Sequence, residues 1–156
     1  MEFAVRRAVP EDAERLSAIA RAAKASWGYP PAWLSAWESD LRITQEDLQS
    51  QLVTVGVQDR NLIGFYALKW DGALWRLEHL WVEPAWHGRG AGRFLFEHAL
   101  DTVRNVRPGR LVIEADPHAA GFYARMGARQ TGSTGAPVEG DPGRRLPIFE
   151  VNVLAW

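Results

Sequence analysis

Apolar and polar positions recur along the chain with two periods, which predict strands and helices in turn. A β-rich stretch over residues 3–9 predicts a first strand, and apolar residues at helical spacing predict an amphipathic helix over residues 11–25. Strands are expected over residues 52–57 and 62–70, because residues 59–61 (DRN) carry a tight hairpin signal between them.

A second helical region is expected between the first helix and these strands. Residues 27–31 (WGYPP) stop the first helix, and residues 44–47 (TQED) predict a capped turn. The short helix between them would carry four apolar residues on one side, namely Trp33, Leu34, Trp37 and Leu41.

The second half of the chain predicts a strand–helix–strand unit. A long strand over residues 73–82 leads through a glycine-rich turn into a helix over residues 89–104. The apolar run 110–115 (RLVIEA) is typical of a parallel strand that is covered on both faces. This order predicts a right-handed crossover.

The chain closes with a short helix, two strands and a loop, and the whole predicts one α/β domain over residues 1–156. These last elements are a helix over 117–126 that ends at Gly127, a strand over 128–131, a loop over 133–145 and a strand over 146–154. We expect a central mixed sheet of about six to seven strands with about four helices on its two faces.

Composition narrows the class of protein. The 156 residues are 47% hydrophobic and 24% charged with a net charge of -1, which is ordinary for a globular protein and offers no general attraction for nucleic acid or anionic membrane. There is no cysteine, which excludes thiolate metal sites and Cys nucleophiles, and no apolar run approaches the ~20 residues that span a bilayer. The four histidines also lack the spacing of metal ligands, so we expect no metal site. Without a membrane-spanning run, we expect a cytoplasmic protein.

The stretch over residues 77–100 carries the clearest chemical signal. It runs from a strand through Gly88, Gly90 and Gly92 into a helix, and such a turn presents backbone N–H groups at the positive end of the helix. A phosphate group could bind there. A P-loop would need Gly-Lys-Ser/Thr, and a dinucleotide fingerprint would need glycine in place of Arg93, so neither motif fits.

Two motifs together resemble the GCN5-related N-acetyltransferases. The run from Val82 to Gly92 resembles that family's acetyl-coenzyme A loop, Gln/Arg-x-x-Gly-x-Gly/Ala, with His87 in the position of the usual Gln or Arg. Residues 116–127 (DPHAAGFYARMG) resemble its Asn-x-x-Ala-x-x-Phe-Tyr-x-x-x-Gly segment, with Asp116 in place of Asn. The order and separation of the motifs match, and the resemblance covers nearly the whole chain.

The resemblance implies that acetyl-CoA is the cofactor. Pantetheine would pair with the strand before the turn, and the pyrophosphate would bind the glycines. The cofactor-binding residues so implied are Leu80, Trp81, Val82, His87, Gly88, Arg89, Gly90, Ala91, Gly92, Arg93, Asp116 and Phe122. A backbone N–H near Val82 would stabilise the oxyanion.

Acyl transfer to an amine also needs an acid and a base. Tyr123 matches the family's general acid, which would protonate the leaving thiolate; the alternative is a core aromatic beside Phe122. Glu78 and His79 lie on opposite faces of the strand before the turn, and either could be the base or a buried structural group.

The acceptor would lie near the turn that follows the first helix. Trp27, Tyr29 and Trp33 could form an aromatic wall for a cationic amine, or could simply pack the second helix on the sheet. We expect an acetyl-CoA-dependent N-acetyltransferase for a primary amine of a small molecule or a peptide N-terminus. The alternatives are a transferase for another acyl-CoA and a catalytically inactive CoA-binding sensor. An exposed final strand could pair with the same strand of a second copy, so a homodimer is possible.

Overall fold

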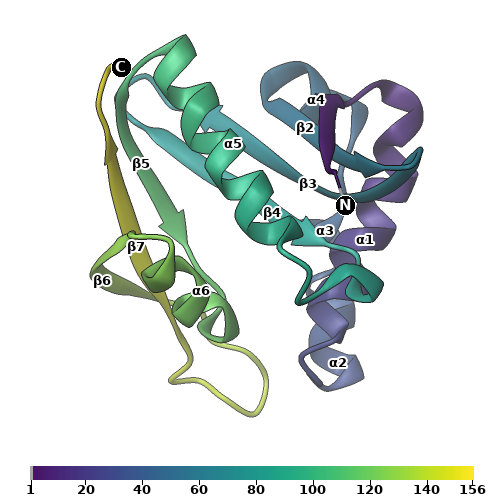
Figure 1. Cartoon of the computed structure of the whole chain (residues 1–156). Helices are drawn as coiled ribbons and strands as arrows, with labels where there is room; N and C mark the ends of the chain where they lie inside the picture. Colours follow the sequence, from purple (N-terminus) through teal and green to yellow (C-terminus); the bar gives the residue numbers. More distant parts are fainter. Residues whose placement is uncertain (1) are drawn as a thin grey trace. The chain divides into compact units, whose positions relative to one another are not determined.

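Seven strands and six α-helices are distributed along residues 2–156, the part of the chain that this computed structural model describes (Figure 1). The elements are β1 (Ala4–Arg7), α1 (Ala13–Ala25), α2 (Pro31–Ala36), α3 (Glu38–Leu41), α4 (Gln45–Ser50), β2 (Leu52–Gln58), β3 (Asn61–Trp70), β4 (Trp75–Val82), α5 (Ala91–Val106), β5 (Gly109–Glu114), α6 (Ala120–Arg125), β6 (Arg129–Gly135) and β7 (Arg145–Val153). Short 3-10 helices at Pro10–Asp12, Pro84–Trp86 and Pro117–Ala119 precede α1, α5 and α6.

The strands form a mixed sheet in the order β1-β2-β3-β4-β5-β7-β6. β4 and β5 pair in parallel through Trp75 with Leu111 and Arg76 with Val112, whereas β1–β2, β2–β3, β5–β7 and β6–β7 are antiparallel. Parallel pairing across α5 is what the strand–helix–strand pattern predicts. The expected α/β class and mixed sheet are confirmed.

The chain divides into two compact units, each made of two segments. The first contains Met1–Lys69 and Glu78–Ala99, and the second contains Trp70–Leu77 and Leu100–Trp156. The single domain expected over residues 1–156 stays a prediction.

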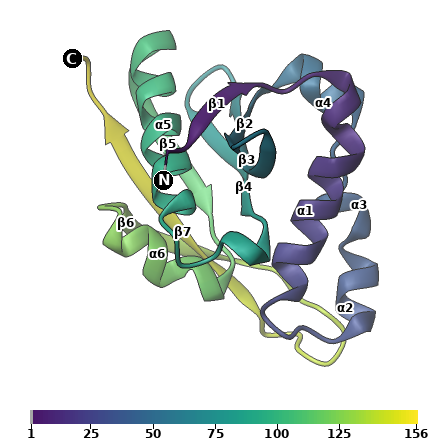
Figure 2. The same cartoon turned by 45° about the vertical axis from the view of Figure 1, so that its right-hand side comes forward.

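In the first unit, helices cover both faces of β2 and β3 (Figure 2). One face packs against α1 in a buried cluster of Leu16, Ile19, Ala20, Leu41, Ile43, Val53, Val55, Phe65 and Ala67. The opposite face of β3 carries Gly64 and Tyr66, which meet α5: a Cβ on Gly64 would lie 3.0 Å from Leu95, and the Tyr66 hydroxyl lies 2.8 Å from His98 Nδ1. Because successive side chains of a strand point to opposite faces, one face of β3 packs against α1 and the other face packs against α5.

In the second unit, β5, β7 and β6 form an antiparallel group with α6 beside β6 and β7 (Figure 1). Leu111, Ile113 and Phe149 are almost fully buried between them. The Trp75 indole N–H donates to the Arg107 carbonyl at 2.9 Å, which ties the start of β4 to the end of α5. This core is apolar, as the run 110–115 predicts.

Three local features refine the predicted elements. The hairpin between β2 and β3 turns through Asp59 and Arg60, which have left-handed φ values of 50° and 69°, as a two-residue turn of this kind requires. The expected single helix breaks at Trp37 into α2 and α3. The expected strand 128–131 extends to Gly135, because it pairs with β7 as far as Arg145.

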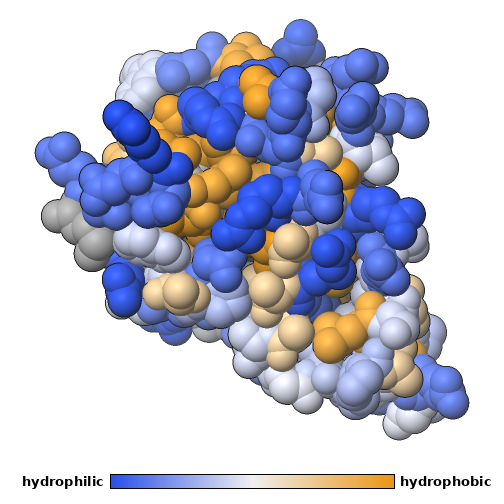
Figure 3. Space-filling view, turned by 90° about the vertical axis from the view of Figure 1, so that its right-hand side faces the viewer, coloured by the Kyte–Doolittle hydropathy of each residue, from blue (hydrophilic) through white to orange (hydrophobic). Residues whose placement is uncertain are grey.

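No helix within residues 2–156 is long and apolar enough to cross a membrane. Within the same residues, no group of three or more His, Cys, Asp or Glu side chains is placed to hold a metal ion. On the face drawn in Figure 3, apolar residues show between hydrophilic ones, as on most globular proteins.

Candidate active site

The end of β4 presents backbone groups at its edge remote from β3. The Glu83 N–H donates to the Ile63 carbonyl of β3 at 2.8 Å. Successive residues of a strand direct their N–H and C=O groups to alternate edges, so those of Leu80 and Val82 point away from β3, whereas those of Trp81 point toward it. Of the three strand residues predicted to bind the cofactor, the backbone geometry favours Leu80 and Val82.

His87 connects this strand end to the glycine-rich turn. Its Nε2 lies 2.8 Å from the Val82 carbonyl oxygen, so the imidazole N–H donates to the backbone. The ring is otherwise exposed. The side chain at this position therefore closes the turn onto β4, which gives a structural role to the residue that departs from the family pattern.

The glycine-rich turn has the backbone geometry of an anion site. Gly88 and Gly90 adopt left-handed φ values of 74° and 85°, and a Cβ on either would meet nothing within 4 Å, so the backbone is open to an approaching ligand. The first i→i−4 bond of α5 runs from the Phe94 N–H to the Gly90 carbonyl at 3.0 Å. The preceding N–H groups, from residues 91–93, therefore lie at the open N-terminus of a 16-residue helix. The turn fits a phosphate group.

The two arginines near this turn are already engaged by their own neighbours. The Arg89 guanidinium stacks 5.1 Å from the Trp86 ring, and Arg93 Nε lies 2.8 Å from Glu97 one helical turn further along α5. Both lie on the exposed surface. The backbone N–H groups, rather than these side chains, are therefore the better placed ligands for an anion.

Gly64 allows β3 to approach the end of β4. A Cβ at this position would lie 2.6 Å from the Trp81 carbonyl oxygen and 3.2 Å from Val82 Cα. Only glycine fits without moving the backbone, because real Cβ atoms do not come so close to a carbonyl oxygen. No sequence pattern singled out this glycine, and its meaning depends on the neighbouring strand.

His79 and Glu78 occupy very different environments on opposite faces of β4. The Trp81 indole N–H donates to His79 Nδ1 at 3.0 Å, which leaves the ring proton on Nε2. Removal from solvent lowers the pKa of His79 to about 4, although Asp47 and Asp40 act in the opposite direction. The Glu78 side chain is exposed. His79 is thus a neutral imidazole whose acceptor nitrogen is occupied.

In the second unit, Tyr123 lies buried on α6. Its ring packs 5.2 Å from Phe122 and 6.0 Å from Phe149, and it is only 6% exposed. Burial raises the pKa of the Tyr123 phenol above its ordinary value, so it keeps its proton at neutral pH. A phenol that stays protonated can donate a hydrogen bond, but its raised pKa makes it a weaker proton donor than a general acid with an ordinary phenol pKa.

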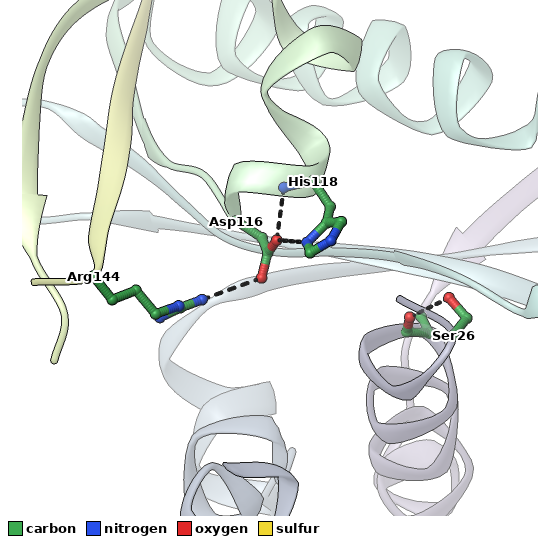
Figure 4. Close-up of polar contacts among 5 residues, drawn as sticks. Ser26, Asp116, His118 and Arg144 are labelled. Atoms are coloured by element: carbon green, nitrogen blue, oxygen red, sulfur yellow. Dashed lines mark hydrogen bonds and ion pairs between the residues drawn. The ribbon is translucent and has the colours of Figure 1, made fainter. Parts of the chain in front are cut away.

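Asp116 holds together the start of the α6 segment (Figure 4). One of its oxygens accepts from the His118 backbone N–H at 2.8 Å and lies 3.1 Å from His118 Nδ1, and the other lies 3.5 Å from the buried Arg144 guanidinium. These contacts cap the 3-10 turn and anchor the loop before β7. They give Asp116 a structural role beside the cofactor role predicted for it. Figure 4 also shows Ser26, whose hydroxyl donates to the Ala23 carbonyl at 2.6 Å at the end of α1.

The three predicted acceptor residues gather at the end of α1 and the start of α2. Tyr29 lies 5.7 Å from Trp33, and Trp27 lies 6.0 Å from Trp81 of β4. Sequence reasoning missed Trp37, whose ring is 4.9 Å from Tyr29, and Lys24, whose ammonium group lies among these rings. The available signal was that Lys24 is one of two lysines in the chain and stands three residues before Trp27.

The chain resembles proteins of known family over nearly its whole length. It is 28% identical to the peptidyl-lysine N-acetyltransferase YjaB of Salmonella typhimurium over 154 residues, which cover 97% of this chain and 98% of the relative. Its fold matches a GCN5-related N-acetyltransferase of Rhodopseudomonas palustris with a TM-score of 0.78 and 25% identity, over 97% of this chain and 96% of that one.

A second similar structure, the PaiA N-acetyltransferase of Thermoplasma acidophilum, was solved in complex with coenzyme A. It has a TM-score of 0.72 and 18% identity and covers 97% of this chain and 99% of that one, which shows a shared fold. The family model of the acetyltransferase (GNAT) domain matches residues 32–137. That match includes more than half of the sequence, and the chain therefore belongs to the GNAT acetyltransferase family.

Proposed function

We propose that this chain transfers an acetyl group from acetyl-CoA to a primary amine of a small molecule or a peptide. The observation that carries the proposal is the open backbone of the turn at Gly88 and Gly90, which leads directly from the free edge of β4 to the N-terminus of α5. The same unit contains the anion-binding amides of this turn, the edge of β4 remote from β3 and the exposed Glu78 carboxylate of β4.

The cofactor residues are assigned from this geometry. The N–H groups of residues 88–93 would bind the pyrophosphate, and the Leu80 backbone would pair with the pantetheine amides as an added strand does, which leaves the Val82 N–H for the acyl oxygen. Bound acetyl-CoA would supply the acetyl group as a thioester. His87 would hold the turn in place through its bond to the Val82 carbonyl.

In the proposed reaction the amine attacks the acyl carbon directly, without an acyl-enzyme intermediate. The C–N bond forms as the C–S bond breaks, the amine loses one proton and the departing sulfur gains one. Val82 presents its N–H at the free edge of β4, where it would stabilise the charge that develops on the acyl oxygen. Tyr123 would donate a hydrogen bond to the sulfur.

The relative acidities limit what Tyr123 can do. A thiol has an ordinary pKa of ~8.5 and a phenol one of ~10, and burial raises that of Tyr123 further. Full proton transfer to the thiolate is therefore uphill by at least about 2 kcal/mol. Tyr123 is better suited to stabilise the departing sulfur with a hydrogen bond than to protonate it outright.

Of the two residues proposed as the base, Glu78 is the better candidate. It is exposed on β4 and could accept the amine proton directly or through water. His79 is neutral, but its Nδ1 already accepts from Trp81, so that a proton could enter there only by breaking this bond. We therefore assign the base to Glu78 and a positioning role to His79.

The acceptor is expected to be an amine on a flexible side chain or a small molecule. The Salmonella relative is named for peptidyl-lysine, which is a primary alkylamine. A lysine side chain of a peptide is therefore one acceptor class that this chain could use.

The donor site is tested by comparing two matched glycines. Gly90 and Gly140 have φ values of 85° and 88°, and a Cβ on either would meet nothing within 4 Å. Alanine at either position forces the same left-handed backbone and should cost about 1 to 2 kcal/mol of stability. Only Gly90→Ala should also weaken CoA binding, by about tenfold or more, in calorimetric titrations of both folded variants. Equal CoA affinities for the two variants would contradict the proposed grip.

A further inference from the structure

Four aromatic rings surround the ammonium group of Lys24. Its Nζ lies 4.4 Å from the ring centroid of Trp37, 5.4 Å from Tyr29, 5.9 Å from Trp81 and 6.0 Å from Trp27. We call these four rings the aromatic cage. All four distances lie within the ~6 Å over which a cation is attracted to the face of a ring.

The cage is built by several elements of the first unit. Trp27 and Tyr29 flank Gly28, whose left-handed φ of 82° reverses the chain after α1, Trp37 lies at the break between α2 and α3, and Trp81 belongs to β4. The rings support one another, with Tyr29 against Trp37 at 4.9 Å and Trp27 against Trp81 at 6.0 Å. A cation site is therefore present without any change in the fold.

The cage adjoins the proposed acetyl-transfer strand. Trp81 is the residue between Leu80 and Val82, and its indole N–H is bonded to His79. A group bound in the cage would lie beside the strand that precedes the glycine-rich turn. The ring contacts and this bond thus place the cage on the face of β4 that carries His79 and Trp81.

We propose that the aromatic cage binds an alkylammonium group of the acyl acceptor, and that Lys24 occupies it as an internal competitor when no acceptor is bound. Cation–π attraction depends on the charge and size of the cation, so the ammonium group of another molecule could take the place of the Lys24 ammonium among these rings. Lys24 is tethered three residues from Trp27, so its effective concentration at the cage is high and an external cation must displace it.

The chemistry of the cage indicates which group of the acceptor it holds. Contact with the rings stabilises the charged form of an amine, and an ammonium ion has no lone pair with which to attack an acyl carbon. The cation in the cage is therefore recognised and not acetylated. The acceptor then carries two separated amines, one bound in the cage and one that reacts; this part rests on the proposed function.

Binding is tested with choline and with its neutral carbon analogue, in which a tert-butyl group replaces the trimethylammonium group. Tryptophan fluorescence titrations would use the wild-type chain, Lys24→Met, Lys24→Gln and, as a control, Lys69→Met, which removes the only other lysine. Both Lys24 variants should bind choline about five- to thirtyfold more tightly than the wild type and Lys69→Met. Adding Trp37→Leu to Lys24→Met should reverse the gain.

The result that would overturn the cage is equal choline affinity in the wild type and in both folded Lys24 variants. Equal binding of choline and its neutral analogue would overturn it as well, because the cage would then be an apolar patch only. This measurement needs no acetyl-CoA, so it tests the cage even if the chain proves to have no transferase activity.

The acceptor class is tested by kinetics on the same variants. Lys24→Met should raise the ratio of kcat/KM for an α,ω-diaminoalkane to kcat/KM for the monoamine of the same length by about five- to thirtyfold. An equal change for both amines would show that the cage does not bind the second cation. Absence of turnover with any amine, together with tight choline binding, would instead contradict the proposed function alone.

Discussion

His79 shows how one residue can be placed correctly by sequence and yet have a different chemistry in the fold. Its position on β4 before the turn is as expected, and a free imidazole would be a suitable base. The structure surrounds it with Phe65 at 5.9 Å and the indole N–H of Trp81 at 3.0 Å. Desolvation then lowers the pKa of His79 to about 4, so the ring is neutral over the physiological range.

This shift makes the stability of the protein depend on pH. The unfolded chain takes up a proton on this residue near the ordinary value of 6.5, whereas the folded chain does so only near 4. Protons therefore favour the unfolded state between these values, and the stabilisation present above about pH 6.5 is lost as the pH falls toward 4. Between about pH 7.5 and 5 the loss should be at most about 2 kcal/mol.

Urea unfolding at these two pH values would measure the loss. His79→Gln keeps an acceptor for the Trp81 indole but cannot titrate, so its free energy of unfolding should fall less over the same interval. An equal fall in the wild type and in His79→Gln would mean that His79 titrates normally in the folded chain.

At the scale of elements, the site depends on how closely β3, β4 and α5 approach one another. Gly64 sets that approach, since its missing side chain leaves room for the Trp81 carbonyl and for Leu95 of α5. The Val82 backbone is next to this contact and also accepts the His87 side chain. A substitution at Gly64 should therefore displace the glycine-rich turn, which lies further along the chain.

Gly64→Ala is expected to destabilise the fold by about 1 to 3 kcal/mol, because the added Cβ overlaps backbone that cannot rotate away. It should also weaken CoA binding, since Val82 would move with Trp81. Gly132→Ala in β6 is the matched control, because a Cβ there would meet nothing within 4 Å. Thermal unfolding with and without CoA separates the two effects. Equal stability of the two variants would show that β4 moves away from the added Cβ without a loss of folding free energy.

For the whole molecule, sequence reasoning was most reliable where the signal is local. Thr44 caps α4 through the Asp47 backbone N–H at 3.1 Å, and Asp47 returns a bond to the Thr44 N–H at 2.9 Å, as the spacing predicts. Gly88 and Gly90 of the glycine-rich turn take left-handed backbones, whereas Gly92 lies inside α5. The family resemblance, which two separated motifs carried, is confirmed by the family model that matches residues 32–137.

Features made by distant residues could not be predicted in the same way. The aromatic cage brings Trp37 from the α2–α3 break and Trp81 from β4 around the ammonium group of Lys24 from α1, and no local period connects these residues. The ring proton of His79 depends on Trp81, and the importance of Gly64 depends on the strand beside it. Sequence therefore predicts the backbone of the donor site better than the environment of its side chains.

The most direct measurement for the whole account is the release of free thiol from acetyl-CoA in the presence of a panel of amines. The proposed function predicts release that requires both the protein and an amine, with the acetylated amine as product. Tyr123→Phe, which keeps the ring and its packing but removes the hydrogen bond to the departing sulfur, should lower kcat by about 100-fold or more. A chain that is stabilised by CoA but releases no thiol with any amine would contradict the account and would be a CoA-binding sensor.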